Sequence, residues 1–327
     1  MSLEEICHPI KDDLSAYETE FKKLLKANVF LVDKVIQYLI IHKGKRLRPI
    51  LVILTSRLHN GNGVALDARN LKAAAIMELL HTASLVHDDV IDSSHQRRGV
   101  PSVNSIWKNK VSVLMGDYLF SKALLAMLSL KSMRAYEIIS ETAERMARGE
   151  LLGLERSKDY WINEEVYFKL ISDKTASLLA AACQLGACAS DENETVLDTM
   201  REFGENLGIA FQIRDDLLDL LGVEKKTGKP IGNDIRDNKI TLPLIYALKQ
   251  AEKREARRVI RLIKRSGKKQ ALKEIVEFIE EYGGVTYASQ RAEHFSGKAL
   301  QSLETYPDTP YKASLIKLVK YITTRDR

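Results

Sequence analysis

The sequence predicts an all-α fold, and three observations favour it. The chain of 327 residues has only 17 Gly and 7 Pro, so it lacks the regular turn punctuation that an all-β protein needs. Stretches as long as 191–221 contain no Pro. Apolar residues recur at three- and four-residue spacing, the pattern of a helix that packs one face on a core. The hydrophobic content of 45% can fill either one large core or two ordinary domains.

The expected helices follow one another without a linker or a shift in composition. The apolar stripes include an early one at Leu31, Val35, Tyr38 and Leu39 and a late one at Ile275, Phe278, Ile279 and Tyr282. Short loops are expected at 58–63, 94–102, 156–163 and 222–238. The last loop combines three Gly with the charged residues Lys225, Lys226, Lys229 and Asp234. We interpret it as a lid that closes over bound phosphates, with a plain surface loop as the alternative.

Cysteine usage and the N-terminus point to a reducing compartment. Cys7, Cys183 and Cys188 have neither metal-ligand spacing nor the pattern of a disulfide framework. The last two fall in the apolar stretch 178–188, where thiols are usually packing residues. Gln184 leaves that stretch too short to span a bilayer. The acidic N-terminal residues do not form a signal peptide, so we expect a soluble, cytoplasmic protein.

The net charge of +6 fits a polyanionic ligand or an anionic membrane surface, although the basic residues are spread along the chain. The densest basic run, 253–265, interleaves apolar residues at helical spacing and offers no aromatic stacking platform. It therefore predicts a solvated amphipathic helix and argues against nucleic acid as a partner. Transient contact with acidic lipid headgroups stays open.

Two acidic clusters carry the chemistry. Each reads Asp-Asp-x-x-Asp, at 88–92 and at 215–219, and each follows an apolar stretch. Residues four apart share one face of a helix, so Asp88 pairs with Asp92 and Asp215 pairs with Asp219. Like charges on adjacent turns repel each other, and a bound cation would offset that cost. Magnesium prefers carboxylate and phosphate oxygens, so we expect the two clusters to grip one polyphosphate through Mg²⁺.

Basic residues accompany the first cluster. Arg97 and Arg98 follow it, and the segment 44–49 with Lys45 and Arg48 precedes it. Arg and Lys are the usual phosphate-binding side chains. A solvated charged face is the alternative for any one of these features, but their combination favours a diphosphate site.

Nine segments carry a family resemblance: GKRLRP at 44–49, HTASLVHDDVID at 81–92, RRG at 97–99, GDYL at 116–119, KTA at 174–176, FQIRDDLLD at 211–219, GKP at 228–230, GND at 232–234 and KITLPL at 239–244. In this order and spacing the sequence resembles the trans-isoprenyl diphosphate synthases, the polyprenyl synthetase family, over nearly the whole chain. It is most similar to the medium- and long-chain members of the octaprenyl diphosphate synthase type. The resemblance implies one domain over 1–327, an all-α bundle of long helices around a central cavity (the isoprenoid synthase fold), and a homodimer.

The resemblance also implies the reaction, a magnesium-dependent head-to-tail condensation of isopentenyl diphosphate with an allylic diphosphate. The allylic diphosphate loses pyrophosphate, the double bond of isopentenyl diphosphate attacks the resulting cation, and a proton leaves. Pyrophosphate departs readily only when metal ions neutralise its charge. By resemblance, the metal ligands are Asp88, Asp92 and Asp215. The roles of holding metal-bound water or orienting the ligands are assigned to Asp89, Asp216 and Asp219.

The remaining roles are carried over from matching positions of the family. The allylic diphosphate would be bound by Arg97, Lys174 and Lys229. Thr175 and Gln212 would lie beside the developing cation, with Lys239 nearby. Isopentenyl diphosphate would be held by Lys45, Arg48, His81 and Arg98.

Histidines on apolar helices are core groups by default. His81, however, lies about two helical turns before Asp88 on the same face, and it matches the family. We therefore interpret it as a diphosphate ligand. His87, His95 and Tyr118 lack that support and are interpreted as structural.

Small residues before the first cluster predict the product length. Ala83 and Ser84 occupy positions where short-product members of the family carry bulky aromatic residues, so we expect a product of about six to eight isoprene units. The tunnel floor is expected among Leu80, Phe120, Leu124, Met127 and Leu128. Geranylgeranyl or farnesyl diphosphate synthesis is the alternative within the family. A terpene cyclase and a non-catalytic subunit of a heteromeric prenyl synthase are the alternatives outside it.

Overall fold

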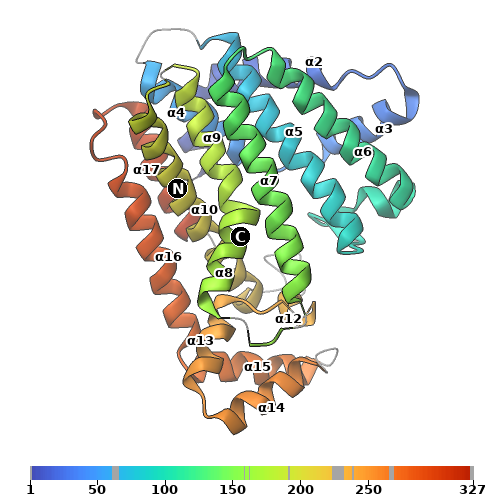
Figure 1. Ribbon diagram of the computed structural model, residues 1–327, viewed down its shortest axis with the longest axis vertical. Helices are drawn as coiled ribbons and strands as arrows, with labels where there is room; N and C mark the ends of the chain where they lie inside the picture. Colours follow the sequence, from blue (N-terminus) through green and yellow to red (C-terminus); the bar gives the residue numbers. More distant parts are fainter. Residues whose placement is uncertain are drawn as a thin grey trace. The chain divides into compact units, whose positions relative to one another are not determined.

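The computed structural model describes residues 2–60, 66–157, 159–161, 163–190, 192–222, 232–237, 239–264 and 269–324. These residues are almost entirely helical (Figure 1), which confirms the predicted all-α class. The exception is a short antiparallel strand pair, β1 (Gln96–Arg97) and β2 (Val100–Pro101), inside the segment that was expected to be a loop.

Contacts divide the chain into two compact units. The first unit comprises Met1–Ala143, Leu178–Gly204 and Glu304–Lys317, and the second comprises Glu144–Ser177, Glu205–Leu303 and Leu318–Arg327. Four divisions fall within helices, namely α7 (Met133–Arg156), α9 (Ser177–Cys188), α10 (Glu194–Leu221) and α17 (Pro310–Thr324), and the fifth lies between Leu303 and Glu304. The expectation of a single domain over 1–327 stays a prediction.

The first unit is built from long helices. Its elements are α1 (Leu3–Cys7), the 3₁₀ turn η1 (His8–Ile10), α2 (Lys11–Leu25), α3 (Phe30–Ile41), α4 (Leu47–Asn60), α5 (Ala68–Ile91), α6 (Val103–Leu128), most of α9 (Ser177–Cys188) and parts of α7, α10 and α17. Helix α4 continues through Asn60, so residues 58–60 of the loop expected at 58–63 are helical, and residues 61–63 lie outside the described residues.

Helices α4 and α5 form the interior of the first unit. Residues 49–56 of α4 and 73–80 of α5 are all buried, as expected for helices that are covered on every side. Asp67 caps α5, since its side chain accepts a hydrogen bond from the Arg69 amide at 3.1 Å. Cys183 and Cys188 of α9 are also buried, which confirms that they are packing residues.

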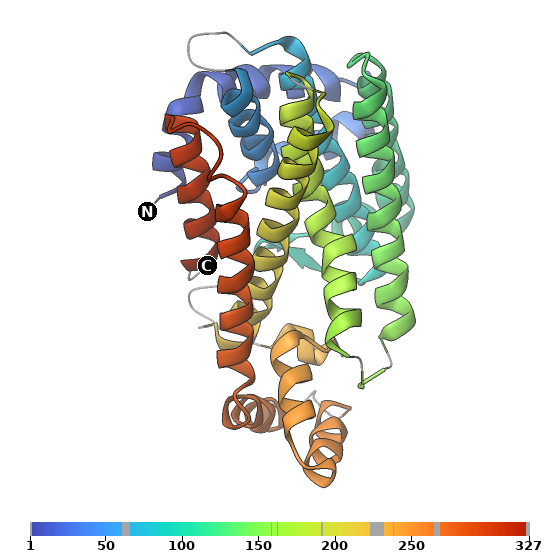
Figure 2. The ribbon, with the colours of Figure 1, turned by 60° about the vertical axis from the view of Figure 1, so that its left-hand side comes forward.

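Helix α6 packs one side against α5, and the two helices run side by side (Figures 1 and 2). Its other side is apolar and exposed: the exposed fractions are 59% for Leu114, 65% for Leu125 and 61% for Leu128. Among the described residues α6 is the one helix long and apolar enough to cross a membrane, a test that core helices of soluble proteins also pass. Lys108, with φ of 70°, kinks the helix near its start.

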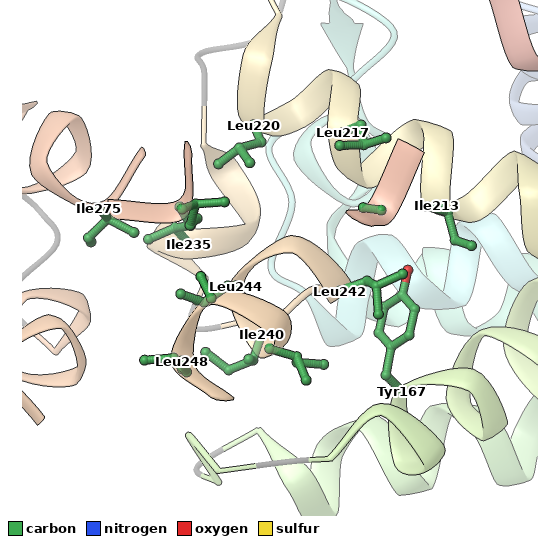
Figure 3. Close-up of a cluster of buried hydrophobic side chains, with 14 of the residues drawn as sticks. Tyr167, Ile213, Leu217, Leu220, Ile235, Ile240, Leu242, Leu244, Leu248 and Ile275 are labelled. Carbon is green, nitrogen blue, oxygen red and sulfur yellow. The ribbon is translucent and has the colours of Figure 1, made fainter. Parts of the chain in front are cut away.

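The second unit has its own hydrophobic core. Its elements are the remaining parts of α7, α10 and α17 together with α8 (Glu164–Ile171), the π-helical turn η2 (Ser172–Ala176), α12 (Asn233–Arg236), α13 (Leu242–Gln250), α14 (Lys253–Ile263), α15 (Lys269–Glu281) and α16 (Gly284–Gln301). Figure 2 shows α13, α14 and α15, in orange, gathered beside one end of α16. Side chains of α8, α10, α12, α13 and α15 meet in the cluster drawn in Figure 3, among them Tyr167, Ile213, Leu217 and Leu242.

Two sequence predictions for this unit are confirmed. Ala256, Val259, Ile260 and Ile263 of α14 are buried while its basic residues face outward, as expected for an amphipathic helix. Ile275, Phe278 and Ile279 of the late apolar stripe are buried on α15. Most of the expected lid at 222–238 lies outside the described residues, and α12 occupies its C-terminal part.

Candidate active site

The first acidic cluster lies at the C-terminal end of α5 in the first unit. Asp88 is half-buried, Asp92 is exposed as the C-cap residue, and Asp89 is 2% exposed. The negative end of the helix dipole disfavours three carboxylates in this turn, so each needs a compensating positive group. For Asp89 that group is Arg97, whose Nε and Nη2 atoms both lie 2.8 Å from Oδ1. Asp88 and Asp92 share a different face of the turn.

The strand pair that follows the cluster explains the Arg-Arg-Gly motif. Arg98 and Gly99 connect β1 to β2 with φ of 56° and 76°, the left-handed backbone of a tight hairpin turn. The turn brings Arg98 back towards the segment before α4, where its Nη1 donates a hydrogen bond to the His42 carbonyl at 3.3 Å. A side chain at Gly44 would collide with the Arg98 guanidinium. The two motifs, distant in sequence, are therefore fitted to each other.

A pocket of about 80 Å³ opens between these elements within the first unit. Four of the predicted site residues line it, namely His81, Asp89, Arg97 and Arg98. Burial and the nearby charges of Arg48, Arg98 and Arg97 lower the pKa of His81 well below its usual value, so its ring is neutral at pH 7. The volume holds several water-sized groups, as a diphosphate requires.

Two residues of this pocket were missed at the sequence level. Arg46 lines it, pairs with Glu18 at 2.7 Å and places its guanidinium 5.5 Å from the Tyr17 ring centroid. Glu78 is 9% exposed, its Oε2 atom has no hydrogen-bond partner, and burial raises its pKa. The sequence contained one signal for Glu78: it precedes His81 by three residues and therefore shares a helix face with it.

The other two residues predicted to bind isopentenyl diphosphate lie beside this pocket's elements. Lys45 is exposed just before α4, and Arg48 lies in the first turn of α4. Neither lines the pocket, although the charge of Arg48 reaches both His81 and Glu78.

His87, which was interpreted as structural, makes structural contacts. Its Nε2 atom lies 3.2 Å from the Val113 carbonyl and 3.4 Å from Asp117 Oδ1. A side chain at Gly116 would overlap the His87 ring, so the Gly-Asp pair of the GDYL segment accommodates this histidine. His95 is exposed and Tyr118 is half-buried.

The second acidic cluster lies near the end of α10 in the second unit. Asp216 is 5% exposed and accepts hydrogen bonds from Tyr167 Oη at 2.6 Å and from Gln212 Nε2 at 2.8 Å. Burial and the charge of Asp234 raise its pKa well above the usual range. Asp215 and Asp219 are half-buried, and Asp219 Oδ2 accepts a hydrogen bond from the Asp234 amide at 3.0 Å.

The KTA segment forms the π-helical turn η2 of the same unit. Thr175 Oγ1 donates to Gln212 Oε1 at 2.9 Å, so a hydrogen-bonded chain runs from Thr175 through Gln212 and Asp216 to Tyr167. Lys174 forms an ion pair with Glu150 of α7. Tyr167 and Glu150 belong to no segment that the sequence analysis selected.

Lys239 and Lys229 are the remaining lysines of the predicted site. Lys239 is exposed, with its ammonium 4.0 Å from Asp237, and its amide donates to the Asp234 carbonyl at 2.7 Å. Lys229 lies outside the described residues.

The carboxylates suit a magnesium ion that is shared with a substrate. Among the described residues, no three His, Cys, Asp or Glu side chains form a group that could hold a metal alone. Magnesium commonly binds through one or two carboxylates, several waters and substrate phosphates. The pairs Asp88 with Asp92 and Asp215 with Asp219 supply hard oxygen donors of this kind, with no thiolate or imidazole that would favour zinc.

Known proteins resemble this chain over its full length. Polyprenyl synthetase is the family that matches, over residues 30–279. The octaprenyl diphosphate synthase of Escherichia coli is 34% identical and covers 100% of both chains. A polyprenyl synthase of Caulobacter crescentus, solved with calcium and isoprenyl diphosphate, is 33% identical with a TM-score of 0.92 and covers 100% of this chain and 98% of its own.

A geranylgeranyl pyrophosphate synthetase of Pyrococcus horikoshii is also 33% identical, with a TM-score of 0.87, and covers 98% of this chain and 99% of its own. Enzymes whose names give products of different length are thus similar to this sequence at 33–34% identity. The fold and the reaction class agree among them. The chain therefore belongs to the polyprenyl synthetase family and is a prenyltransferase with the all-α isoprenoid synthase fold.

Proposed function

We propose that this protein condenses isopentenyl diphosphate with an allylic diphosphate, head to tail, to make an all-trans polyprenyl diphosphate of about six to eight isoprene units. The observation that carries the proposal is the arrangement of the two acidic clusters. In each, the middle carboxylate is buried and held by neighbouring donors, Arg97 for Asp89 and Tyr167 with Gln212 for Asp216. The outer carboxylates of each cluster share one helix face, and there they would hold divalent cations.

Magnesium held by Asp88, Asp92 and Asp215 would neutralise the diphosphate and supply Lewis-acid stabilisation of the leaving group. Asp89, Asp216 and Asp219 would orient these ligands and metal-bound water. Arg97, Lys174 and Lys229 would bind the allylic diphosphate. The carbon–oxygen bond to pyrophosphate then breaks, and the electron pair leaves with the pyrophosphate.

The allylic cation forms beside neutral oxygen atoms. Thr175 and Gln212 are linked by a hydrogen bond, which orients their dipoles before the reaction. Lys239 would lie nearby. The double bond of isopentenyl diphosphate forms the new carbon–carbon bond with the cation, and a proton leaves to restore the double bond.

Isopentenyl diphosphate would be held in the pocket of the first unit, with Lys45 and Arg48 at its margin and His81 and Arg98 in its wall. The pocket contains more cationic than anionic groups, and this charge balance supports binding of a diphosphate. The neutral His81 ring would contribute a hydrogen bond and no charge.

The test is to incubate the purified protein with magnesium, farnesyl diphosphate and excess labelled isopentenyl diphosphate, and to resolve the dephosphorylated products by length. Products ending near six to eight units support the proposal. Products that end at geranylgeranyl or farnesyl length would support the proposed reaction and contradict the proposed chain length. Absence of magnesium-dependent product from any starter favours the non-catalytic subunit of a heteromeric synthase.

We also propose that the protein acts as a cytoplasmic homodimer, with residues 1–327 as one polyprenyl synthetase domain. Leu114, Leu125 and Leu128 of α6 form an exposed apolar strip, and α3, which contacts α6, adds Phe30 at 79% exposure. Clustered exposed apolar side chains of this kind mark an interface, and in a two-fold dimer this strip would be covered by the same strip of a second copy. Release of so apolar a product also fits transient contact with a membrane surface.

A further inference from the structure

The turn that presents Lys174 and Thr175 is a π-helix, an irregular element that needs support. It runs from Ser172 to Ala176 between α8 and α9, and its wider hydrogen bond joins the Ser177 amide to the Ser172 carbonyl. A π-helical turn inside a helix equals the insertion of one residue and is seldom stable without its surroundings. Its reversion to α-helix would change the direction of both side chains.

Asp173 anchors this turn from within. It is 5% exposed and receives hydrogen bonds from Arg145 Nε at 2.9 Å and from Arg148 Nε at 3.1 Å, both on α7. Burial alone would raise the pKa of Asp173, but the two arginines lower it below its usual value, so the carboxylate is charged. Such a buried carboxylate with two guanidinium partners has one well-defined position.

Arg145 extends the anchor to a third helix. Its Nη1 and Nη2 atoms donate to the Glu205 carboxylate of α10 at 3.1 and 2.8 Å, and Nη2 also donates to Ser172 Oγ at 2.8 Å. Ser172 Oγ in turn donates to Glu205. One guanidinium therefore connects α7, α10 and the first two residues of the π-helical turn.

Two glycines bring the neighbouring helices into contact with the same turn. A Cβ atom at Gly149 of α7 would lie 2.7 Å from the Lys174 amide nitrogen. A Cβ atom at Gly208 of α10 would lie 2.5 Å from Ala176 Cα. Larger residues at either position would push the turn away, so the backbone on both sides is shaped to hold it.

We propose that Asp173, held by Arg145, is the positioning residue that sets the direction of Lys174 and Thr175 for the allylic diphosphate. The inference rests on the proposed function. Asp173 does not touch substrate in this assignment. It acts through the turn, because Lys174 follows it directly and Thr175 must stay in register to reach Gln212 at 2.9 Å.

The test compares Asp173→Asn, which keeps the shape and removes the charge, with two controls. Arg258→Gln breaks an exposed ion pair with Glu255 in the same unit, and Asp173→Glu restores the carboxylate. We expect Asp173→Asn to lower kcat by about a hundredfold and to raise KM for the allylic diphosphate, with KM for isopentenyl diphosphate unchanged. Asp173→Glu should recover part of the loss, and Arg258→Gln should match the wild type.

A double-mutant cycle with Lys174→Ala separates positioning from general damage. If Asp173 acts through this turn, Asp173→Asn should reduce kcat by a clearly smaller factor in the Lys174→Ala background than in the wild type, because the part of the effect that passes through Lys174 is then absent. Fully additive losses, or equal increases in both KM values, would overturn the inference. If Asp173→Asn does not fold, Arg145→Lys takes its place, since it keeps the charge and loses the planar fork.

Hydrogen exchange gives a readout that does not depend on catalysis. The amides of 172–177 should exchange faster in Asp173→Asn than in the wild type, while those of α14 and α15 stay protected. Unchanged exchange at 172–177 contradicts the inference. An inactive wild type would contradict the proposed function instead, and the exchange result would still decide whether Asp173 holds the turn.

Discussion

At the scale of single residues, the site depends on buried polar groups that each have defined hydrogen-bond partners. The hydroxyl of Tyr167 donates to Asp216, which is buried and also accepts a hydrogen bond from Gln212. Removing that hydroxyl leaves a buried carboxylate with one donor fewer. We expect Tyr167→Phe to lower the free energy of unfolding by about 1–3 kcal/mol.

Urea unfolding measures this loss, and kcat should fall in the same variant because Asp216 also orients Gln212. Tyr282→Phe in the same unit is the matched control. A Tyr167→Phe enzyme with unchanged stability and unchanged kcat would show that the hydrogen bond to Asp216 is dispensable.

His81 predicts a pH dependence of stability. Its folded-state pKa is lowered by burial and by three arginines, whereas the unfolded chain titrates near pH 6.5. The contribution of neutral His81 to the free energy of unfolding is therefore fully present above about pH 6.5. It declines as the pH falls below that value, because protonation favours the unfolded chain. The free energy of unfolding should fall less between pH 7.5 and pH 5.5 in His81→Gln than in the wild type, as judged by urea titrations. If the free energy of unfolding depends on pH in the same way in both proteins, His81 is not the buried neutral group that causes the decline.

The tunnel wall is tested by volume. Ala83 is 2% exposed and Ser84 is half-buried on α5, so an aromatic ring at either position must occupy interior space. We expect Ala83→Phe and Ser84→Phe to shorten the product, because packed interiors accommodate added bulk poorly. Product chromatography measures the length. Active variants whose products keep the wild-type length would show that neither residue lines the tunnel.

The candidates for the tunnel floor differ in burial. Leu80 and Met127 are buried, at 4% and 8% exposure. Phe120, Leu124 and Leu128 lie on the exposed side of α6. Within the isolated chain, only the first two can close an interior cavity.

At the scale of elements, the β1–β2 hairpin and the segment before α4 act together. Gly44→Ala would force the Arg98 guanidinium out of its place, since the added Cβ atom overlaps it. We expect KM for isopentenyl diphosphate to rise about tenfold, the loss of roughly one charged hydrogen bond. Steady-state kinetics with each substrate varied in turn provide the measurement, and KM for the allylic diphosphate should not change.

Gly297→Ala is the control for that substitution. Its Cβ atom would meet open space within α16, so the change should stabilise the protein by up to about 1 kcal/mol without altering kinetics. If both glycine variants behave alike, the fit between Gly44 and Arg98 has no functional role.

At the scale of the whole molecule, the apolar face of α6 predicts self-association. Leu125, at 65% exposure, should be covered in a dimer, and a buried charge there is costly. We expect Leu125→Glu to convert a dimer into a monomer in light scattering after size exclusion. Leu154→Glu, at an exposed position of the second unit, is the control and should not change the mass. A monomeric wild type would contradict the homodimer.

Much of this protein could be derived from the sequence by itself. The all-α class followed from apolar spacing and from few Gly and Pro, because those signals are local. The Asp-Asp-x-x-Asp clusters predicted a magnesium and polyphosphate site, since residue type and four-residue spacing place the outer carboxylates on one helix face. The reaction itself followed from the family resemblance. The buried cysteines and the amphipathic α14 were likewise predictable from short stretches of sequence.

Only the tertiary structure decided how those motifs are supported. The partners of Asp89 and Asp216, the hairpin inside a predicted loop, and the arginines on Asp173 all join residues from different elements. The physical reason is that burial and hydrogen-bond partnership depend on which helices pack together, whereas spacing along one helix records only its own faces.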